Sequence, residues 1–457
     1  MLTLADLARA IPQATLHGDG GLRVERVSTD TRTLAPGALF FALRGPSFDA
    51  HDFIVQAVAG GAGALVVERL VDAPLPQLVV PDARRALGLA AAVWRAPFAL
   101  PLAVVTGSNG KTTVTQMVAA ILAAAYGAGK RLATRGNLNN DVGLPLMLFD
   151  LHAQHRAAVL ELGMNHAGEI AWLAQLARPT VALVNNAQRE HQEFLDGIEA
   201  TARENAEAIA ALPPDGVAVF PADDACAGIW RQAAGTRRVL DFACHGQAAV
   251  TASYRLRPED SELFVATPQG EIELRLPLAG EHNVHNALAA TATALALGVP
   301  LAAIREGLAN FAPVAGRGVR LRTAAGALLI DDSYNANPDS VRAAIDQLAA
   351  CPAPRVLVLG DMGEVGTQGP EFHREIGAYA RAAGIEALLA LGNATRATVA
   401  AFGAGARHYD AVEPLAHDAA QLAGSGGTVL VKGSRFMKME RVIRALTATE
   451  EEEAAHG

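Results

Sequence analysis

The sequence predicts an α/β protein of more than one domain, in which mostly parallel sheets carry helices on both faces. Two stretches alternate apolar, strand-like runs with segments of helical periodicity, and a linker at Pro313–Gly318 separates them. The chain has 457 residues, which is more than one hydrophobic core supports, since single cores stop growing at about 250–300 residues. Together these observations predict two to four domains.

Residues 1–98 predict a smaller unit, with a short amphipathic helix at Leu4–Ile11 followed by short strands. The strands are expected at Arg23–Ser28, Ala38–Ala42 and Ala64–Val67. Residues 28–32 and 40–52 place hydroxyls, aspartates and arginines beside aromatic rings. This mixture suits a pocket for a polar ring and phosphates, although a solvated loop explains the same residues more simply.

The first alternating stretch begins at Pro101, and the second follows the linker. In the first stretch the expected strands are Pro101–Val105, Ala157–Glu161 and Val181–Asn185. Its helices are expected from Thr112 onward and at 167–177 and 198–212. Residues 215–280 are richer in strands, expected at Val217–Phe220, Thr251–Leu256 and Glu271–Leu276, before a helix at Asn283–Leu297. In the second stretch the expected strands are Ala327–Ile330, Val356–Leu359, Ala387–Leu391 and Thr428–Val431.

A glycine-rich turn joins the first expected strand to the helix that follows it. Its residues are Thr106, Gly107, Ser108, Asn109, Gly110, Lys111, Thr112 and Thr113. The glycines let the backbone approach a polyphosphate, Lys111 can reach its β- and γ-phosphates, and the Thr112 hydroxyl suits Mg²⁺. Val105 replaces the first glycine of the general pattern G-x-x-x-x-G-K-[ST]. The alternative is a turn with a chance lysine, but the flanking strand and helix favour a site for ATP or GTP.

Composition excludes several other classes of protein. The formal charge is −9 and the basic residues are scattered, which argues against a nucleic-acid groove or binding to an anionic membrane. Cys226, Cys244 and Cys351 form no C-x-x-C pair, which fits a reducing compartment without disulfides or a zinc ribbon. No apolar run approaches 18 residues and no basic segment opens the chain. We expect a cytoplasmic protein.

Polar residues follow the expected strands of the first stretch, where ligands of parallel sheets bind. Glu161 can offer a carboxylate to Mg²⁺ held by ATP, although a surface ion pair is an equally good interpretation. His191 follows the strand end at Asn185 and stays ambiguous, because a lone histidine is usually structural.

Further candidates lie beyond residue 280. Asn283 and Asn286 are three residues apart on one helix face, where their amides can pair with adenine, unless Asn283 caps the helix. Arg317 in the linker could reach a γ-phosphate, and Asp332 could accept bonds from ribose hydroxyls. Each of these signals is weak alone.

Together, the segments TGSNGKTT, ELGMN, HNVHNALAA, AGRG, DDSYNANP and LVKGSR resemble, in this order, the ATP-dependent Mur ligases of peptidoglycan precursor synthesis. The resemblance covers essentially the whole chain and implies three domains. These are an N-terminal α/β domain for a UDP moiety (1–98), a central ATP-binding domain with a phosphate loop on a mostly parallel sheet (99–313), and a C-terminal Rossmann-like, doubly wound domain (314–457). The last is expected to close over the site.

The resemblance also implies roles for the candidate residues. Lys111, Glu161, His191 and Arg317 are the expected catalytic residues, and Thr112, Glu161 and His191 the expected ligands of Mg²⁺. Residues 106–113 are expected to bind the phosphates of ATP, Asn283 and Asn286 the adenine, and Arg317 and Asp332 the phosphates and ribose.

Four further segments, DTR with FFALRGPSFDAHDF, GNLNNDVGLP, DDSYNANP and LGDMGEVG, resemble members of the family that act on UDP-N-acetylmuramoyl-tripeptide and D-Ala-D-Ala. The DNPR-type motif of the diaminopimelate-adding members is absent. The substrate-binding residues implied are Ser28, Thr31, Arg32, Arg44, Asn139, Asn140, Asn335 and Asn337. The resemblance implies an acyl-phosphate intermediate. We expect these two substrates as partners, no nucleic acid, no integral membrane association and a monomer, whereas the sequence does not show whether the chain joins a partner complex.

The sequence departs from the family at one position. A family lysine, modified to a carbamate that helps hold a second Mg²⁺, falls on Asn205, which cannot be carbamylated. We hypothesise that Glu204 or an ordered anion supplies the missing negative charge.

The sequence leaves two alternative functions open. One is another ligase of the same superfamily, such as a folylpolyglutamate synthetase or a different Mur enzyme, and the acceptor substrate decides between them. The other is a nucleotide-dependent binding protein without ligase chemistry, which only the formation of an amide bond excludes. The acidic run Glu450–Glu453 is expected to be a disordered tail.

Overall fold

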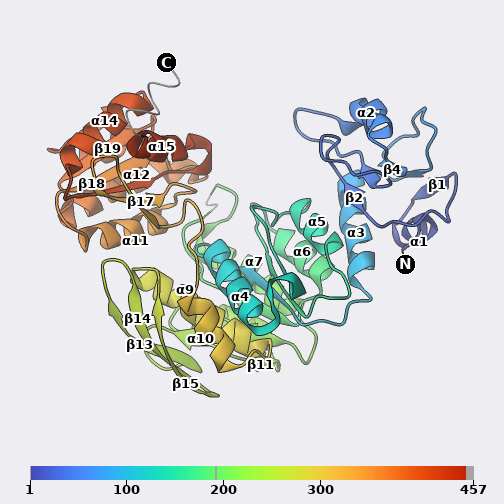
Figure 1. The fold of residues 1–457 in the computed structure, drawn as a ribbon, viewed down its shortest axis with the longest axis horizontal. Coiled ribbons are helices and arrows are strands. Elements are labelled where there is room, and N and C mark those ends of the chain that lie inside the picture. The colour runs from blue at the N-terminus through green and yellow to red at the C-terminus, as the bar shows by residue number, and fades with distance from the viewer. Residues whose placement is uncertain (1, 191–192, 449–457) are drawn as a thin grey trace.

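The computed structural model describes residues 2–190 and 193–448 (Figure 1). Its strands form four sheets: β1-β5-β4-β3-β2, β11-β10-β9-β6-β8-β7, β12-β13-β14-β15 and β16-β17-β21-β18-β19-β20. In Figure 1 the blue N-terminal part and the orange-red C-terminal part lie at opposite ends, with the cyan-to-yellow central part between them. This arrangement confirms the expected α/β fold.

The N-terminal part is a small sheet with helices on both faces. Its elements are α1 (Leu4–Ala10), β1 (Thr15–His17), β2 (Val27–Ser28), β3 (Leu39–Phe41), α2 (Ile54–Ala59), β4 (Ala64–Val67), β5 (Gln77–Val79) and α3 (Ala83–Arg95). Side chains alternate along β3, so Leu39 and Phe41 pack against α1 and α3 whereas Phe40 packs against α2. Both faces of β3 and β4 are therefore buried, as the apolar runs predict.

The central part contains an all-parallel sheet with β6 in its middle. Its elements are β6 (Leu102–Thr106), α4 (Lys111–Tyr126), β7 (Arg131–Ala133), α5 (Gly143–Phe149), β8 (Ala157–Glu161), α6 (Glu169–Ala177), β9 (Val181–Val184), α7 (Gly197–Ala210), β10 (Val217–Val219), α8 (Ala227–Ala234) and β11 (Arg238–Val239). Val105 lies opposite Glu161, and Thr106 lies opposite Val184. This register brings the phosphate loop, Glu161 and Asn185 to one edge of the sheet.

A second, mostly antiparallel sheet completes the central part. It consists of β12 (Phe242–Ala243), β13 (Val250–Leu256), β14 (Ser261–Thr267) and β15 (Gly270–Leu276), followed by α9 (Glu281–Ala296) and α10 (Leu301–Ala309). The alanine-rich α9 packs in one core with α4, the parallel sheet and this second sheet. That burial on all sides holds the start of α9 beside the phosphate loop.

The C-terminal part is the expected doubly wound sheet. Its elements are β16 (Val319–Arg322), β17 (Leu328–Asp332), α11 (Pro338–Ala349), β18 (Arg355–Gly360), α12 (Gly369–Ala382), β19 (Ala387–Leu391), α13 (Thr395–Phe402), β20 (Ala406–Tyr409), α14 (Val412–Ala423), β21 (Thr428–Lys432) and α15 (Glu440–Thr447). Only the edge strand β16 runs antiparallel to its neighbour. Helices α11 to α13 cover one face, and α14 and α15 cover the other.

Several elements were not expected from the sequence, among them α3 and β14. In β14 the outward-facing Phe264 is half exposed, so the strand lacks the contrast between apolar and polar faces that marks an amphipathic strand.

The three cysteines are free, as expected. Within the described ranges no helix is both long and apolar enough to cross a bilayer. The domain boundaries stay predictions, and Glu450–Glu453 lies outside the described residues.

Helices α10 and α4 cross so closely that the contact requires a glycine. A Cβ atom on Gly307 would lie 2.4 Å from the Cα of Ile121. We expect Gly307→Ala to lower the free energy of unfolding by about 1–3 kcal/mol, because the two backbones must separate. Gly228→Ala in α8 is the control, because a Cβ there meets nothing within 4 Å, and it should stabilise the protein by about 0.5–1 kcal/mol. Urea unfolding followed by circular dichroism measures both, and a wild-type midpoint for Gly307→Ala would contradict this account.

Candidate functional site

A cleft of about 1800 Å³ joins all three parts of the chain. The central part contributes the phosphate loop and Glu161, the C-terminal part contributes Asp332 and Lys432, and the N-terminal part contributes Arg84. The cleft lies at the carboxyl ends of parallel strands β6, β8 and β17, where open α/β sheets bind their ligands.

The phosphate loop depends on a glycine at the start of α4. Gly110 has a left-handed φ of +81°, and a Cβ there would lie 2.3 Å from Asn286 Oδ1 and 2.6 Å from Asn185 Nδ2. Those amides brace the loop, since Asn185 Nδ2 donates to the Asn109 carbonyl at 2.7 Å. The backbone N–H groups that open α4 therefore face the cleft as an anion site.

Lys111 is held above this loop. Its Nζ donates to the carbonyls of Gly107 and Ser108 at 2.6 and 2.9 Å, and pairs with Glu190 Oε2 at 3.0 Å. Glu190 is a site residue that the sequence reasoning missed, because one glutamate in a loop forms no recognisable pattern.

Other residues of the loop occupy different positions. Ser108, Asn109, Thr112 and Thr113 line the cleft, as expected for nucleotide-binding residues. Thr106 does not; it is buried beneath the loop, and its hydroxyl donates to Asn205 Oδ1 at 2.6 Å. The Thr106 side chain therefore faces away from the cleft, and its predicted contact with the nucleotide stays a prediction that this position does not favour.

Glu161 ends β8 with its carboxylate almost fully buried at the cleft. Asn139 Nδ2 donates to Oε1 at 2.7 Å, whereas Oε2 has no hydrogen-bond partner among the described residues. A buried carboxylate oxygen without a partner is costly unless a cation or proton satisfies it. This atom fits a ligand of Mg²⁺ and argues against the alternative of a surface ion pair.

The remaining expected metal ligands are only partly described. Thr112 lines the same cleft, whereas His191 lies outside the described residues, so its role stays a prediction. Within residues 2–190 and 193–448, no three His, Cys, Asp or Glu side chains gather as a metal cluster.

The structure argues against Glu204 as the replacement for the family carbamate, whereas the alternative of an ordered anion stays a prediction. Both carboxylate oxygens of Glu204 accept backbone N–H bonds at the start of α6, from Gly168 and Ile170 at 2.9 Å. Neither Glu204 nor the fully buried Asn205 lines the cleft. Glu204 is used to satisfy the N–H groups that a helix start leaves without partners.

The structure confirms that Asn283 and Asn286 share one face of α9. Asn286 Nδ2 donates to Asn283 Oδ1 at 3.3 Å, and both residues line the cleft. Gly280 occupies the N-cap position, so the capping alternative for Asn283 is wrong. His285 supports this arrangement: its Nε2 donates to the Asn185 carbonyl at 2.8 Å, and burial lowers its pKa, which favours the neutral ring.

On the C-terminal side, two basic residues stack on one aromatic ring. Arg317 lies 4.2 Å from the centre of the Tyr334 ring, and Arg435 lies 5.4 Å from it. The parallel register sets Asp332 opposite Lys432, and their side chains form an ion pair of 2.6 Å. Both expected residues, Arg317 and Asp332, therefore line the cleft.

The residues expected to bind the substrate divide into two groups. Those that line the cleft are Asn139, Asn140, Asn335 and Asn337. Those that lie on the N-terminal part outside its lining are Ser28, Thr31, Arg32 and Arg44. In the second group Arg32 pairs with Asp30 and Arg44 pairs with Glu68, so local ion pairs hold both guanidinium groups.

The glycine at the start of α4 yields a direct test of this geometry. We expect Gly110→Ala to weaken binding of a fluorescent ATP analogue by at least about tenfold, because its methyl group collides with the two bracing amides. Gly127→Ala at the other end of α4 is the control, since its φ is also positive, at +91°, yet nothing lies within 4 Å of its Cβ. It should cost about 1–3 kcal/mol of stability without changing affinity, because glycine is the residue that tolerates φ +91° with ψ 145°. Equal affinities for the two variants would contradict the proposed close approach.

Three family models match consecutive parts of the chain: "Mur ligase family, catalytic domain" over residues 23–95, "Mur ligase middle domain" over 105–294, and "Mur ligase, glutamate ligase domain" over 316–435. UDP-N-acetylmuramoyl-tripeptide--D-alanyl-D-alanine ligase from Escherichia coli (strain K12) is 43% identical over 93% of this chain and 94% of its own length.

Solved structures of MurF ligases match the fold of this chain over nearly its whole length. MurF from Acinetobacter baumannii matches with a TM-score of 0.91 at 37% identity, covering 97% of this chain and 98% of that one. MurF ligase from Thermotoga maritima, solved in complex with ADP, matches with a TM-score of 0.82 at 25% identity, covering 94% and 98%. By its sequence and its fold, the chain belongs to the Mur ligase family.

Proposed function

We propose that this chain is an ATP-dependent amide ligase that adds D-Ala-D-Ala to UDP-N-acetylmuramoyl-tripeptide. The products are UDP-N-acetylmuramoyl-pentapeptide, ADP and phosphate, in peptidoglycan precursor synthesis. The observation that carries the proposal is the single cleft in which residues of all three parts face one phosphate loop. The names of relatives that align over nearly the whole chain support this choice of substrates.

The reaction needs ATP because a carboxylate is a poor electrophile and its oxygen a poor leaving group. In the proposal, the terminal carboxylate of the tripeptide attacks the γ-phosphorus of ATP in line, and the bond to the bridging oxygen of ADP breaks. The resulting acyl phosphate is attacked at its carbonyl carbon by the amine of D-Ala-D-Ala. Phosphate then leaves from the tetrahedral intermediate, the amine nitrogen loses its proton, and an amide bond remains.

The residues of the chain supply positions and charge for these steps. Lys111, now bound to loop carbonyls and Glu190, would exchange those partners for the β- and γ-phosphates. The N–H groups that open α4 would hold the phosphates. Asn283 and Asn286 would bind the adenine, and Arg317 and Asp332, which line the same cleft, would bind the phosphates and ribose. A cleft walled by three domains can also exclude water, which would otherwise hydrolyse the acyl phosphate.

In the same proposal, the unpaired Oε2 of Glu161 and the hydroxyl of Thr112 would hold Mg²⁺, and His191 would be a further ligand. When bound, the cation neutralises charge on the phosphates. Asn139 would orient the Glu161 carboxylate through its bond to Oε1. We further propose that the enzyme acts as a monomer, since the residues of one chain form the walls of the cleft. We also propose that it acts in the cytoplasm, where ATP is available.

The reaction itself is tested by mass spectrometry of the products formed from ATP, D-Ala-D-Ala and each candidate acceptor. The acceptors compared are UDP-N-acetylmuramoyl tripeptides with diaminopimelate or lysine as third residue, shorter UDP-muramoyl peptides, and folates. We expect the pentapeptide product only with a tripeptide. An amide formed only with a folate, or no amide with any acceptor, would contradict the proposal.

Lys111→Ala should reduce kcat by about 10²–10³-fold or more, because the charge that develops on the transferred phosphoryl group loses its ammonium partner. Lys130→Ala, which removes an exposed lysine beyond the far end of α4, is the control and should behave as wild type. Phosphate release that requires both substrates is the readout. Unchanged turnover in Lys111→Ala would refute the role of the lysine.

Glu161→Gln should raise the Mg²⁺ concentration for half-maximal activity by about 10–100-fold, because a neutral amide replaces the carboxylate. Glu199→Gln, at an exposed ion pair of α7, is the matched control. Titration with Mn²⁺ followed by electron paramagnetic resonance measures the same site without turnover. Equal cation affinity in Glu161→Gln and wild type would show that Glu161 is not a ligand.

A further inference from the structure

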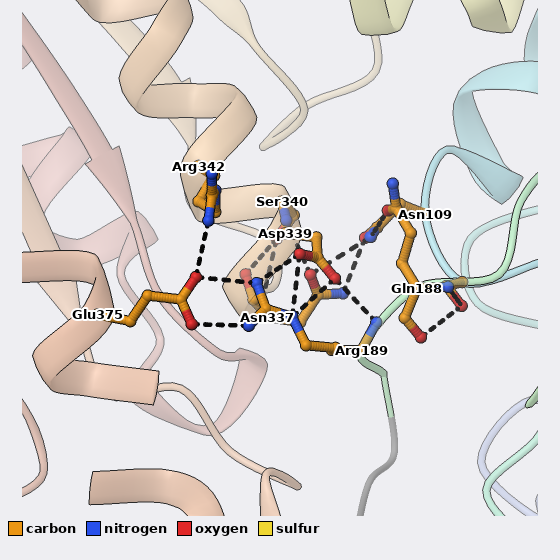
Figure 2. Close-up of polar contacts among 9 residues, drawn as sticks. Asn109, Gln188, Arg189, Asn337, Asp339, Ser340, Arg342 and Glu375 are labelled. Carbon is orange, nitrogen blue, oxygen red and sulfur yellow. Dashed lines mark hydrogen bonds and ion pairs between the residues drawn. The ribbon is translucent and has the colours of Figure 1, made fainter. Parts of the chain in front are cut away.

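The segment that follows β9 lies between the phosphate loop and the C-terminal part (Figure 2). On one side it is bonded to the loop. Asn186 Oδ1 accepts from the Asn109 backbone N–H at 2.8 Å, and the Gln188 N–H donates to Ser108 Oγ at 2.9 Å. Its next residue, Arg189, points the other way, toward α11 and α12. A short stretch of backbone thus contacts both the loop and a different domain.

Arg189 binds two carboxylates of the C-terminal part at once. Its Nη2 donates to Asp339 Oδ1 at 2.6 Å and its Nε donates to the same oxygen at 3.0 Å. Its Nη1 and Nη2 donate to Glu375 Oε2 and Oε1 at 2.7 and 3.1 Å. The backbone N–H of Arg189 also donates to Asp339 Oδ2 at 2.9 Å, and its guanidinium lies over the Phe372 ring. Forked, charge-assisted bonds of this kind fix orientation as well as distance.

A second contact ties the phosphate loop directly to the same helix. Asn337 Nδ2 donates to Asn109 Oδ1 at 2.8 Å, and Asn109 Nδ2 donates to Asn337 Oδ1 at 3.3 Å. Asn337 is the N-cap of α11, where its Oδ1 also accepts from the Ser340 N–H at 2.8 Å. The start of α11, which carries Asp339, is therefore hydrogen-bonded to the loop that is expected to bind the phosphates of ATP.

Arg189, Asp339 and Glu375 form a network of three partly buried charges rather than one exposed ion pair. The three side chains of the contact are only 20% (Arg189), 23% (Asp339) and 28% (Glu375) exposed. Hydrogen bonds from Arg189 are the main cause that lowers the pKa of Glu375 below its ordinary value, which shows that the charged carboxylate is the favoured partner of this guanidinium. An isolated surface pair contributes only about 0–1 kcal/mol, but a network with fixed geometry contributes more.

We propose that Arg189 is a positioning residue of the ligase. It holds the C-terminal domain on the phosphate loop, in the arrangement that places Arg317 and Asp332 across one cleft from Lys111, and it touches no reactant itself. The inference rests on the proposed function for the reaction that is being positioned. The domain contact can be measured without that reaction.

The test compares Arg189→Ala and Arg189→Lys with a matched control. Arg342→Ala removes another arginine that binds Glu375, at 2.9 Å, but this arginine belongs to the same domain as Glu375. We expect Arg189→Ala to lower kcat by at least about tenfold, with the KM for ATP within about threefold, because positioning is lost while the loop remains. Arg189→Lys keeps the charge and should recover part of kcat, and Arg342→Ala should match wild type.

Small-angle X-ray scattering of the full chain with a nonhydrolysable ATP analogue supplies a second readout. The radius of gyration should rise in Arg189→Ala and not in Arg342→Ala. The double variant Asp339→Asn/Glu375→Gln should reproduce the loss of kcat, and adding Arg189→Ala to it should cost little more. An unchanged radius of gyration in Arg189→Ala, or a loss of thermal stability with wild-type kcat, would overturn the proposal.

The two proposals fail separately. If wild type forms no pentapeptide but the scattering difference remains, the domain contact stands and the reaction assignment falls. If wild type forms the pentapeptide and Arg189→Ala is as compact and as active, the positioning role falls. Should Arg189→Ala not fold, as judged by circular dichroism, the double variant Asp339→Asn/Glu375→Gln decides. Wild-type kcat and a wild-type radius of gyration in that variant would overturn the positioning role.

Discussion

The site depends on the absence of a side chain at Gly110. Because no Cβ is present there, the amides of Asn185 and Asn286 can approach the loop backbone and brace it from the strand end and from α9. The same amides connect the loop to Asn283, which faces the cleft. The phosphate loop is thus held from behind by side chains of two other elements, so that its N–H groups are fixed before any ligand arrives, which favours binding of phosphates.

From this braced loop, contacts extend to the third domain. Asn109 bonds to Asn337, and the neighbouring segment carries Arg189 to Asp339 and Glu375 (Figure 2). The unit that carries the phosphate loop and the unit that carries Arg317 are therefore linked by directional hydrogen bonds. Directional contacts suit a joint that must reach one geometry for chemistry and still separate to exchange substrates and products.

Much of the fold follows from local sequence patterns. Buried parallel strands such as β6, β8 and β18 are short apolar runs between helical segments, and this signal is strong. The fold class and the phosphate loop could therefore be predicted from the sequence. Strand β14 could not, because its outward-facing Phe264 removes the contrast between apolar and polar faces. Helix α3 does bury one amphipathic face at helical spacing, but that face consists mainly of alanines, which carry a weaker apolar signal than larger side chains.

The site was predictable only where a residue type and its position both carry meaning. Lys111 after two glycines and Glu161 at a strand end satisfy that condition, and both lie in the cleft. Glu190 and Arg189 could not be predicted in this way, because neither stands in a recognisable motif. Glu190 contacts Lys111, 79 residues away along the chain, and Arg189 contacts Asp339, 150 residues away. Glu204 is the opposite case. Its place beside Asn205 in the sequence suggested a charge for the metal site, but in the structure its carboxylate accepts backbone N–H groups at the start of α6.

The most direct measurement of the central claim is a crystal structure with a nonhydrolysable ATP analogue and UDP-N-acetylmuramoyl-tripeptide. This account predicts that Lys111 Nζ leaves Glu190 and contacts the β- and γ-phosphates, with the γ-phosphorus facing the terminal carboxylate of the peptide. A triphosphate bound away from the loop, or a peptide carboxylate on the far side of the cleft from the γ-phosphate, would contradict it.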